Sequence, residues 1–326
     1  MNTLVSISEA KRLVAEGRPL LFAGDEGLLK ALPTGRWIGG TIPYFMANDG
    51  GKKTAEELFV TSLPDFVLEG TSKLYAPAQL SQIPADYPEN GVSFIIMPAA
   101  SRAAGDFAQH CVSWKGLFDR PLVGWISGVD LNDLGKVMPK VFNGATGESS
   151  ENAAAVLHVK LPKGRVAKVD IINLFTQGDG DAITFDRDGL DVTDCFVNGE
   201  RRNLAEYLGE RKIDTRLPLV ADYQGAMVNV AFQGVDAVAK RTSFYAPVFQ
   251  GVTYRLARAL SEDYAVAFQK EATARAASPV FACNCILNYL YGSLEGKRTG
   301  NMTGPITFGE VAYMLLNQTM VYVDFE

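Results

Sequence analysis

Side chains able to bind a small ligand or to do chemistry gather in the last forty-eight residues, Pro279 to Glu326. An apolar run ends at Cys283, a turn-rich stretch from Gly292 to Gly309 contains Glu295, and Glu310 follows directly. A carboxylate can hold a cationic group of a ligand, and a thiol beside a base can act as a nucleophile. Because binding sites are usually built on loops held between rigid elements, this segment is predicted to contain the functional site.

Two predicted strands hold that segment in place. The run from Val280 to Cys283 is too short for a helix and follows a proline, which indicates a buried strand. The stretch from Thr319 to Phe325 is rich in β-branched and aromatic residues, as strands are. A third strand-like run, Arg36 to Phe45, contains Gly39-Gly40-Thr41. Glycine inside a strand marks either a bulge or the close approach of a ligand or another backbone, and both explanations stay open at this point.

These features resemble the FIST family (F-box and intracellular signal transduction), whose members are regarded as sensory modules for small ligands. The resemblance extends from about Leu20 to Phe325, and its elements fall in the order of the family. Gly39-Gly40-Thr41 occupies the place of the family's Gly-small-Thr/Ser strand. The residues that carry the closing signature are Cys283, Glu295, Gly309-Glu310 and Asn317-x-Thr319.

The resemblance implies a non-catalytic intracellular sensor that needs no cofactor or metal. It would bind a small molecule, amino-acid-like or an amine, and signal through a separate protein partner. In the expected pocket the glycines would let the ligand approach the backbone, Thr41 and Asn284 would hydrogen-bond it, and Glu295 or Glu310 would hold a cationic group. The predicted ligand-binding residues are Gly39, Gly40, Thr41, Cys283, Asn284, Glu295, Gly309 and Glu310.

Two other classes of function stay open. The first is a thiol hydrolase in which Cys283 is the catalytic nucleophile and Glu295, Glu310 or His110 is its base. The second is a structural or scaffold protein, which would expose an apolar patch in place of a pocket. A zinc site is not expected, because Cys283 and Cys285 supply two thiolates at most and a structural zinc ion needs four ligands.

Length and charge bound the fold and the partners. A chain of 326 residues exceeds the usual size of one hydrophobic core, so we expect two coupled halves, residues 1–185 and 186–326. The predicted class is α+β, with mostly antiparallel or mixed sheets packed by helices. The net charge of −6 is spread along the chain without a basic stripe, and nucleic acid is therefore not an expected partner.

Cysteine usage and hydropathy predict the compartment. The four cysteines are irregularly spaced, and no apolar signal segment opens the chain, which favours the reducing cytoplasm. No run of eighteen or more apolar residues occurs, so no membrane association is expected.

Several local patterns make sharper predictions. Ser6 and Glu9 have the spacing of a helix N-terminus, and Asn198-Gly199 predicts a tight β-hairpin. Ser101 to Phe118 has apolar residues at helical spacing and predicts one helix. His158 falls in an alternating run and is predicted to lie on the solvent face of a strand.

Overall fold

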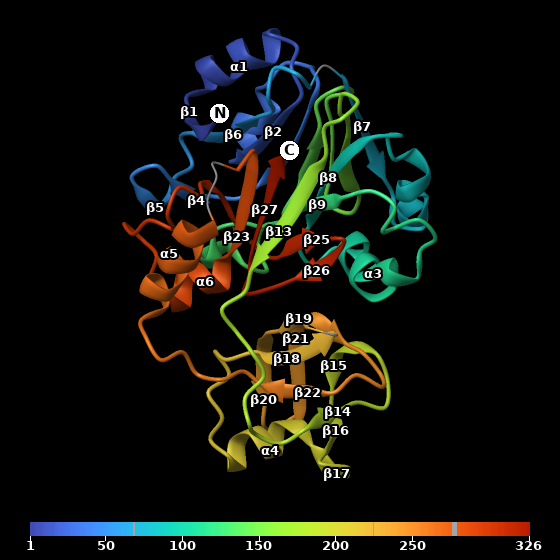
Figure 1. Ribbon diagram of the computed structural model, residues 1–326, viewed down its shortest axis with the longest axis vertical. Helices are drawn as coiled ribbons and strands as arrows, with labels where there is room; N and C mark the ends of the chain where they lie inside the picture. The colour runs from blue at the N-terminus through green and yellow to red at the C-terminus, as the bar shows by residue number, and fades with distance from the viewer. Residues whose placement is uncertain (68, 224, 276–278) are drawn as a thin grey trace. The chain divides into compact units, whose positions relative to one another are not determined.

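The computed structural model describes residues 1–67, 69–223, 225–275 and 279–326, which form two compact units (Figure 1). The predicted α+β class is confirmed, because mixed and antiparallel sheets are packed with helices. The predicted division at residue 185 differs from the one observed, since the second unit is inserted in the sequence of the first. The first unit contains Met1–Ile172, Ala265–Leu315 and Met320–Glu326, and the second contains Asn173–Tyr264 and Leu316–Thr319.

The C-terminal strands belong to the first unit because they pair with strands from early in the chain. β24 is antiparallel to β4 near Phe45, and β27 is antiparallel to β13. A half that started at residue 186 would leave those ladder hydrogen bonds without partners, so a division into consecutive halves does not describe this fold. The elements concerned are β4 (Tyr44–Ala47), β13 (Ala167–Ile172), β24 (Gly304–Thr307) and β27 (Met320–Phe325).

A six-stranded sheet with strand order β26-β25-β9-β8-β12-β7 forms the centre of the first unit. β8 and β9 are parallel, whereas β12 is antiparallel to both β8 and β7. Helix α3 (Arg102–His110) packs on β8, and the 3-10 helix η1 (Pro77–Asp86) packs on β7 and β12. The strands of this central sheet are β7 (Glu69–Tyr75), β8 (Gly91–Pro98), β9 (Leu122–Ser127), β12 (Ala154–Lys160), β25 (Glu310–Ala312) and β26 (Met314–Leu316).

Two further sheets of the first unit pack against the central one. The first of these sheets has the strand order β1-β6-β2-β3-β10-β11, and its strand β3 contacts β8 and β12. The second has the order β13-β27-β23-β24-β4-β5. Its strand β23 contacts β25, and its strand β24 contacts β9. The strands not yet given are β1 (Asn2–Val5), β2 (Leu20–Gly24), β3 (Trp37–Thr41), β5 (Gly50–Lys53), β6 (Leu58–Ser62), β10 (Val141–Asn143), β11 (Glu148–Ser150) and β23 (Phe281–Cys285).

Side-chain caps start the helices where the sequence predicts them. Ser6 Oγ accepts a hydrogen bond of 3.3 Å from the Glu9 amide, which confirms the predicted N-cap of α1. The helix predicted from Ser101 to Phe118 is shorter, since α3 ends at His110 and a 3-10 turn follows. The remaining helices of this unit and its short 3-10 turns are α1 (Ile7–Ala15), α2 (Glu26–Lys30), α5 (Tyr264–Arg275), α6 (Ile286–Tyr291), η2 (Cys111–Ser113) and η3 (Leu131–Asp133).

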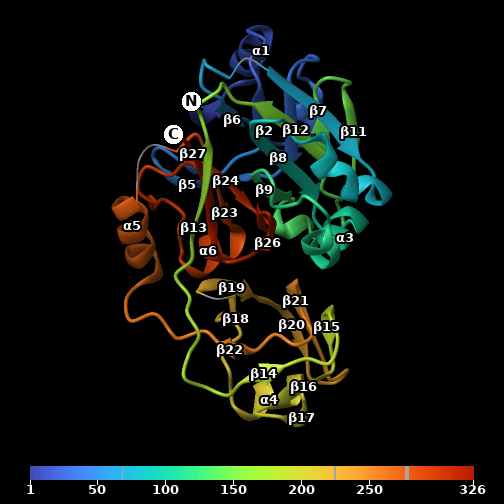
Figure 2. The ribbon, with the colours of Figure 1, turned by 45° about the vertical axis from the view of Figure 1, so that its right-hand side comes forward.

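The second unit contains a six-stranded sheet, a three-stranded sheet and helix α4 (Leu204–Glu210) (Figure 2). Side chains from these elements form an aromatic core of its own. Asn198 and Gly199 both have positive φ, +50° and +87°, which confirms the predicted hairpin. The strand orders are β17-β16-β14-β22-β18-β19 and β15-β21-β20. The strands are β14 (Ile183–Thr184), β15 (Gly189–Val192), β16 (Asp194–Val197), β17 (Glu200–Asn203), β18 (Leu219–Tyr223), β19 (Ala226–Val230), β20 (Phe232–Asp236), β21 (Arg241–Val248) and β22 (Tyr254–Leu256).

The segment predicted to contain the site is bounded as expected. Strands β23 and β27 occur at the two predicted positions, but the chain forms the unpredicted helix α6 directly after β23. Among the described residues, no helix is long and apolar enough to cross a membrane.

Candidate functional site

The glycine pair of β3 serves sheet packing in this structure. A Cβ atom on Gly40 would lie 2.7 Å from Ile96 Cγ2 and 2.8 Å from the ring of Trp125, both in the central sheet. A Cβ atom on Gly39 would lie 3.0 Å from Leu29, on helix α2. The close approach that the glycines permit is therefore made by neighbouring elements, and Trp125 fills the space next to Gly40 that a ligand would use.

The structure brings Cys283 and Glu310 into one buried group. Both side chains are inaccessible, at 1% and 0% exposure. Cys283 Sγ donates a hydrogen bond to the backbone oxygen of Gly124 at 3.3 Å, and Thr307 Oγ1 lies 3.2 Å from Glu310 Oε1. Burial, together with the negative charge of Glu310, raises the pKa of Cys283 well above that of a free thiol. A thiol held protonated and out of reach of solvent is a poor nucleophile.

Asn284 and Ser127 carry buried polar atoms without partners among the described residues. Asn284 Oδ1 accepts hydrogen bonds of 2.8 Å from the Cys285 amide and from Asn288 Nδ2 in the first turn of α6. Asn284 Nδ2 and Ser127 Oγ make no hydrogen bond there. Buried polar atoms are normally satisfied by protein or by ordered water, so an ordered water is the expected partner of each of these two atoms.

The other predicted residues divide between core and surface. Thr41 is buried at the end of β3, where its Oγ1 accepts a hydrogen bond of 2.9 Å from the Lys140 amide. The Gly309 carbonyl accepts one of 2.8 Å from the Ile126 amide. Glu295 is exposed, so it is not part of the buried group with Cys283 and Glu310. Apart from the exposed Glu295, the predicted site residues thus lie in a closed, partly polar core and do not line an open pocket.

His158 is buried at 7% exposure, so its predicted place on a solvent face is wrong. Its Nε2 lies 2.8 Å from Tyr75 Oη, and its Nδ1 lies 2.8 Å from Ser93 Oγ. Tyr75 donates its single hydroxyl proton to Asp86 Oδ2 at 2.6 Å, so it must accept the Nε2–H of the imidazole. Nδ1 then accepts from Ser93, and the chain of hydrogen bonds runs from Ser93 through His158 and Tyr75 to Asp86.

Burial keeps the imidazole neutral, while the negative charge of Asp86 at the end of the chain acts in the opposite direction. Burial lowers the pKa of His158 to about 4, and the hydrogen bond from Lys73 holds the pKa of Asp86 below its usual range. Ser93 has 0% exposure, so no substrate reaches its hydroxyl in this structure. A Ser-His pair of this kind satisfies buried polar atoms and is not an assembled catalytic site.

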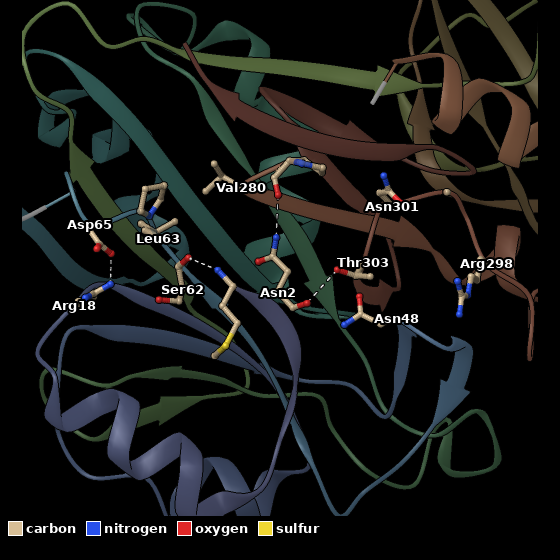
Figure 3. Close-up of a pocket in the computed structure, with 14 residues that line it drawn as sticks. Asn2, Arg18, Asn48, Ser62, Leu63, Asp65, Val280, Arg298, Asn301 and Thr303 are labelled. Carbon is tan, nitrogen blue, oxygen red and sulfur yellow. Dashed lines mark hydrogen bonds and ion pairs between the residues drawn. The ribbon is translucent and has the colours of Figure 1, made fainter. Parts of the chain in front are cut away.

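An open cleft lies in the first unit and has a volume of about 820 Å³ (Figure 3). The turn-rich passage singled out in the sequence contributes Arg298, Asn301 and Thr303 to it. Segments from the start of the chain supply the remaining polar side chains, which sequence patterns did not single out. The polar side chains that these segments contribute are Asn2, Arg18, Asn48, Ser62 and Asp65.

An ion pair and two hydrogen bonds join residues that line one end and the floor of the cleft. Arg18 and Asp65 form an ion pair at one end. Asn2 joins two lining segments, because its Nδ2 donates to the Pro279 carbonyl at 2.9 Å and its backbone oxygen accepts from Thr303 Oγ1 at 3.2 Å. The Oδ1 atom of Asn2 has no hydrogen-bond partner among the described residues.

The other end of the cleft carries polar groups with no internal partner. Within the described ranges, the side chains of Asn48, Arg298 and Asn301 make neither hydrogen bonds nor ion pairs. Figure 3 shows these three side chains on the opposite side of Asn2 from the Arg18–Asp65 pair. Donors and acceptors left open at a concave surface are what a pocket for a small polar ligand provides.

The described part of the chain contains no group of three His, Cys, Asp or Glu side chains placed as metal ligands. The fold and the cleft together define an α+β protein with an open polar cleft in its first unit. The chain belongs to DUF6976, a family of unknown function whose model matches residues 5–326. A comparison with curated proteins found no match.

Proposed function

We propose that this protein is a non-catalytic module that binds a small ligand in the cleft of the first unit. The observation that carries the proposal is the set of three polar side chains, Asn48, Arg298 and Asn301, that line an 820 Å³ cleft without partners among the described residues. A cleft of this size lies within the usual range for small-molecule sites. The resemblance of the chain to FIST sensory modules supports the same class of function.

A signalling role would require a protein partner, and the chain offers a candidate contact. The apolar side chains of Leu134, Val137 and Met138 are 53%, 46% and 43% exposed within one loop. Exposed apolar residues that cluster in this way are typical of protein contacts. We also propose a cytoplasmic location, which the small number and irregular spacing of the cysteines support.

The cysteine-dependent enzyme is the weaker alternative. Cys283 is inaccessible, and its pKa is raised where a nucleophile needs it lowered. His110 lies at the end of α3 with an exposed side chain, and Glu295 is also exposed, so neither shares the burial of the thiol. A thiol mechanism would require this core to open.

The test is a thermal-shift screen of the whole protein against amino acids, polyamines, short carboxylates and inorganic phosphate. A ligand that binds only the folded state stabilises it by RT ln(1 + [L]/Kd), about 2.7 kcal/mol at a hundredfold excess over Kd. Asn48→Trp should fill the cleft and abolish the shift, because Asn48 is an exposed lining residue. Asn132→Trp, at an exposed residue outside the lining, is the matched control and should keep the shift. A shift that survives Asn48→Trp, or no shift with any compound, would contradict the proposal.

A further inference from the structure

We infer that the ligand of this cleft carries an oxyanion, a carboxylate or a phosphate, which binds between Arg298, Asn48 and Asn301. The inference rests on the proposed function and names the chemical class of its ligand. The family resemblance implies a ligand that is amino-acid-like or an amine and whose cationic group is held by Glu295 or Glu310. The inferred site instead binds an anionic group of the ligand, because neither carboxylate lines the cleft.

The charges that line the cleft favour an anion. The lining side chains, two arginines and one aspartate, contribute a side-chain charge of +1 (2 − 1), and Asp65 is already neutralised by Arg18. Arg298 is left as a cation without an ion-pair partner in the described ranges. The chain as a whole has a net charge of −6, so this cleft is a local positive site on an acidic protein. A concave positive site concentrates field lines and attracts anions.

The donors at this end also match an oxyanion in number and kind. A guanidinium group presents several N–H donors in a planar fork that fits a carboxylate or a phosphate, and each amide side chain adds an NH₂ group. Figure 3 shows Asn48, Asn301 and Arg298 on the same side of Asn2, and all three line the cleft. An amine placed here would meet a cation and find no free carboxylate among the described lining residues.

The experiment measures binding of inorganic phosphate and of succinate by isothermal titration calorimetry. It compares the unaltered protein with Arg298→Gln and with the control Lys297→Gln. Lys297 is the neighbouring residue, its side chain is exposed and does not line the cleft, and its replacement removes the same charge. At least one anion should bind, Arg298→Gln should raise its Kd about tenfold or more, and Lys297→Gln should change it by less than about twofold. The anion that binds more tightly distinguishes phosphate from carboxylate.

Two results would overturn the inference. The first is equal loss of affinity in Arg298→Gln and Lys297→Gln, which would show only a general effect of charge. The second is no binding of either anion while an amine or a neutral compound from the thermal-shift screen binds and is blocked by Asn48→Trp. In that case the proposed function would stand and the inference would fail; if no compound depends on Asn48, both fail.

Discussion

His158 illustrates how burial decides what a reactive side chain does. Its type and its contacts with Ser93 and Tyr75 would suit proton transfer. Yet the imidazole is inaccessible, and burial lowers its pKa to about 4, so it stays neutral at physiological pH. Its contribution is to stability, and that contribution depends on pH.

The free energy of unfolding should decrease as the pH falls from about 6.5 to about 4, the two pKa values of His158 in the unfolded and folded states. The unfolded chain binds a proton with a pKa near 6.5, and the folded protein binds it with a pKa of about 4, so protonation favours unfolding. Stability is fully present above about pH 6.5 and is lost toward pH 4. Between pH 7 and pH 4.5 this single group should cost about 2 kcal/mol.

Urea unfolding at those two pH values measures this effect. His158→Gln should lose about 2 kcal/mol less than the unaltered protein on acidification, because its side chain does not titrate. His110→Gln is the matched control, since it removes the other histidine of the chain, from an exposed position. Equal acid losses in the unaltered protein and in His158→Gln would contradict the account.

The sequence indicated one segment of the candidate site, but not the individual residues that line the cleft. The passage from Gly292 to Gly309 was predicted to carry the site, and it does supply Arg298, Asn301 and Thr303 to the cleft. Asn48 was not predictable, because no local pattern shows that it lies near residues some two hundred and fifty positions later. Long-range proximity of this kind is set by sheet pairing, such as β24 with β4.

At the scale of elements, β3 lies tightly against the central sheet because Gly40 has no side chain. Ile96, Trp125 and Ser127 all approach the position that its Cβ would occupy. The two adjacent glycines in the sequence predicted either a bulge in this strand or the close approach of a ligand or another backbone. The close approach is made by protein, since the facing side chains are buried.

Gly40→Ala should therefore destabilise the protein by about 1–3 kcal/mol, the usual cost of overpacking a filled core. Gly105→Ala is the matched control: Gly105 lies in α3, and nothing lies within 4 Å of its added methyl group. That change should be neutral or should stabilise the protein by about 0.5–1 kcal/mol. Urea unfolding at pH 7 measures both. A Gly40→Ala protein as stable as the unaltered one would show free space beside Trp125, where a ligand could fit.

Secondary structure was predictable where local signals agree. Ser6 and the Asn198-Gly199 pair produced the expected cap and hairpin, since capping and turn geometry depend only on neighbouring residues. The long helix predicted from Ser101 failed at His110, after which the chain turns through η2 and Trp114 packs edge-on against Phe107. Tertiary packing overrides helical periodicity at such a point.

At the scale of the whole molecule, the chain has more than one core. The second unit has a buried cluster that includes Phe185, Phe244 and Tyr254. Length predicted two cores, but it did not predict that the second is inserted in the sequence of the first. Strand pairing between distant segments determines that arrangement, and composition carries no information about it.

Phe244→Ala should weaken the second unit selectively. Phe244 is 2% exposed, and truncation of such a residue costs about 3–5 kcal/mol. Hydrogen exchange followed by mass spectrometry should show faster exchange in β18, β21 and β22, while β8 and β12 of the first unit keep their protection. Faster exchange of equal size in all five strands would show that the two cores unfold as one.

The central claim is that a small ligand binds in the cleft of the first unit, and amide chemical shifts test it most directly. The measurement is a ¹H–¹⁵N TROSY titration of the whole protein with glutamate, spermidine, succinate and inorganic phosphate, each in turn. The account predicts saturable shifts for at least one compound, concentrated at Asn48, Ser62, Asn301 and Thr303. Shifts confined to other surfaces, or no saturable shift with any of the four compounds, would contradict it.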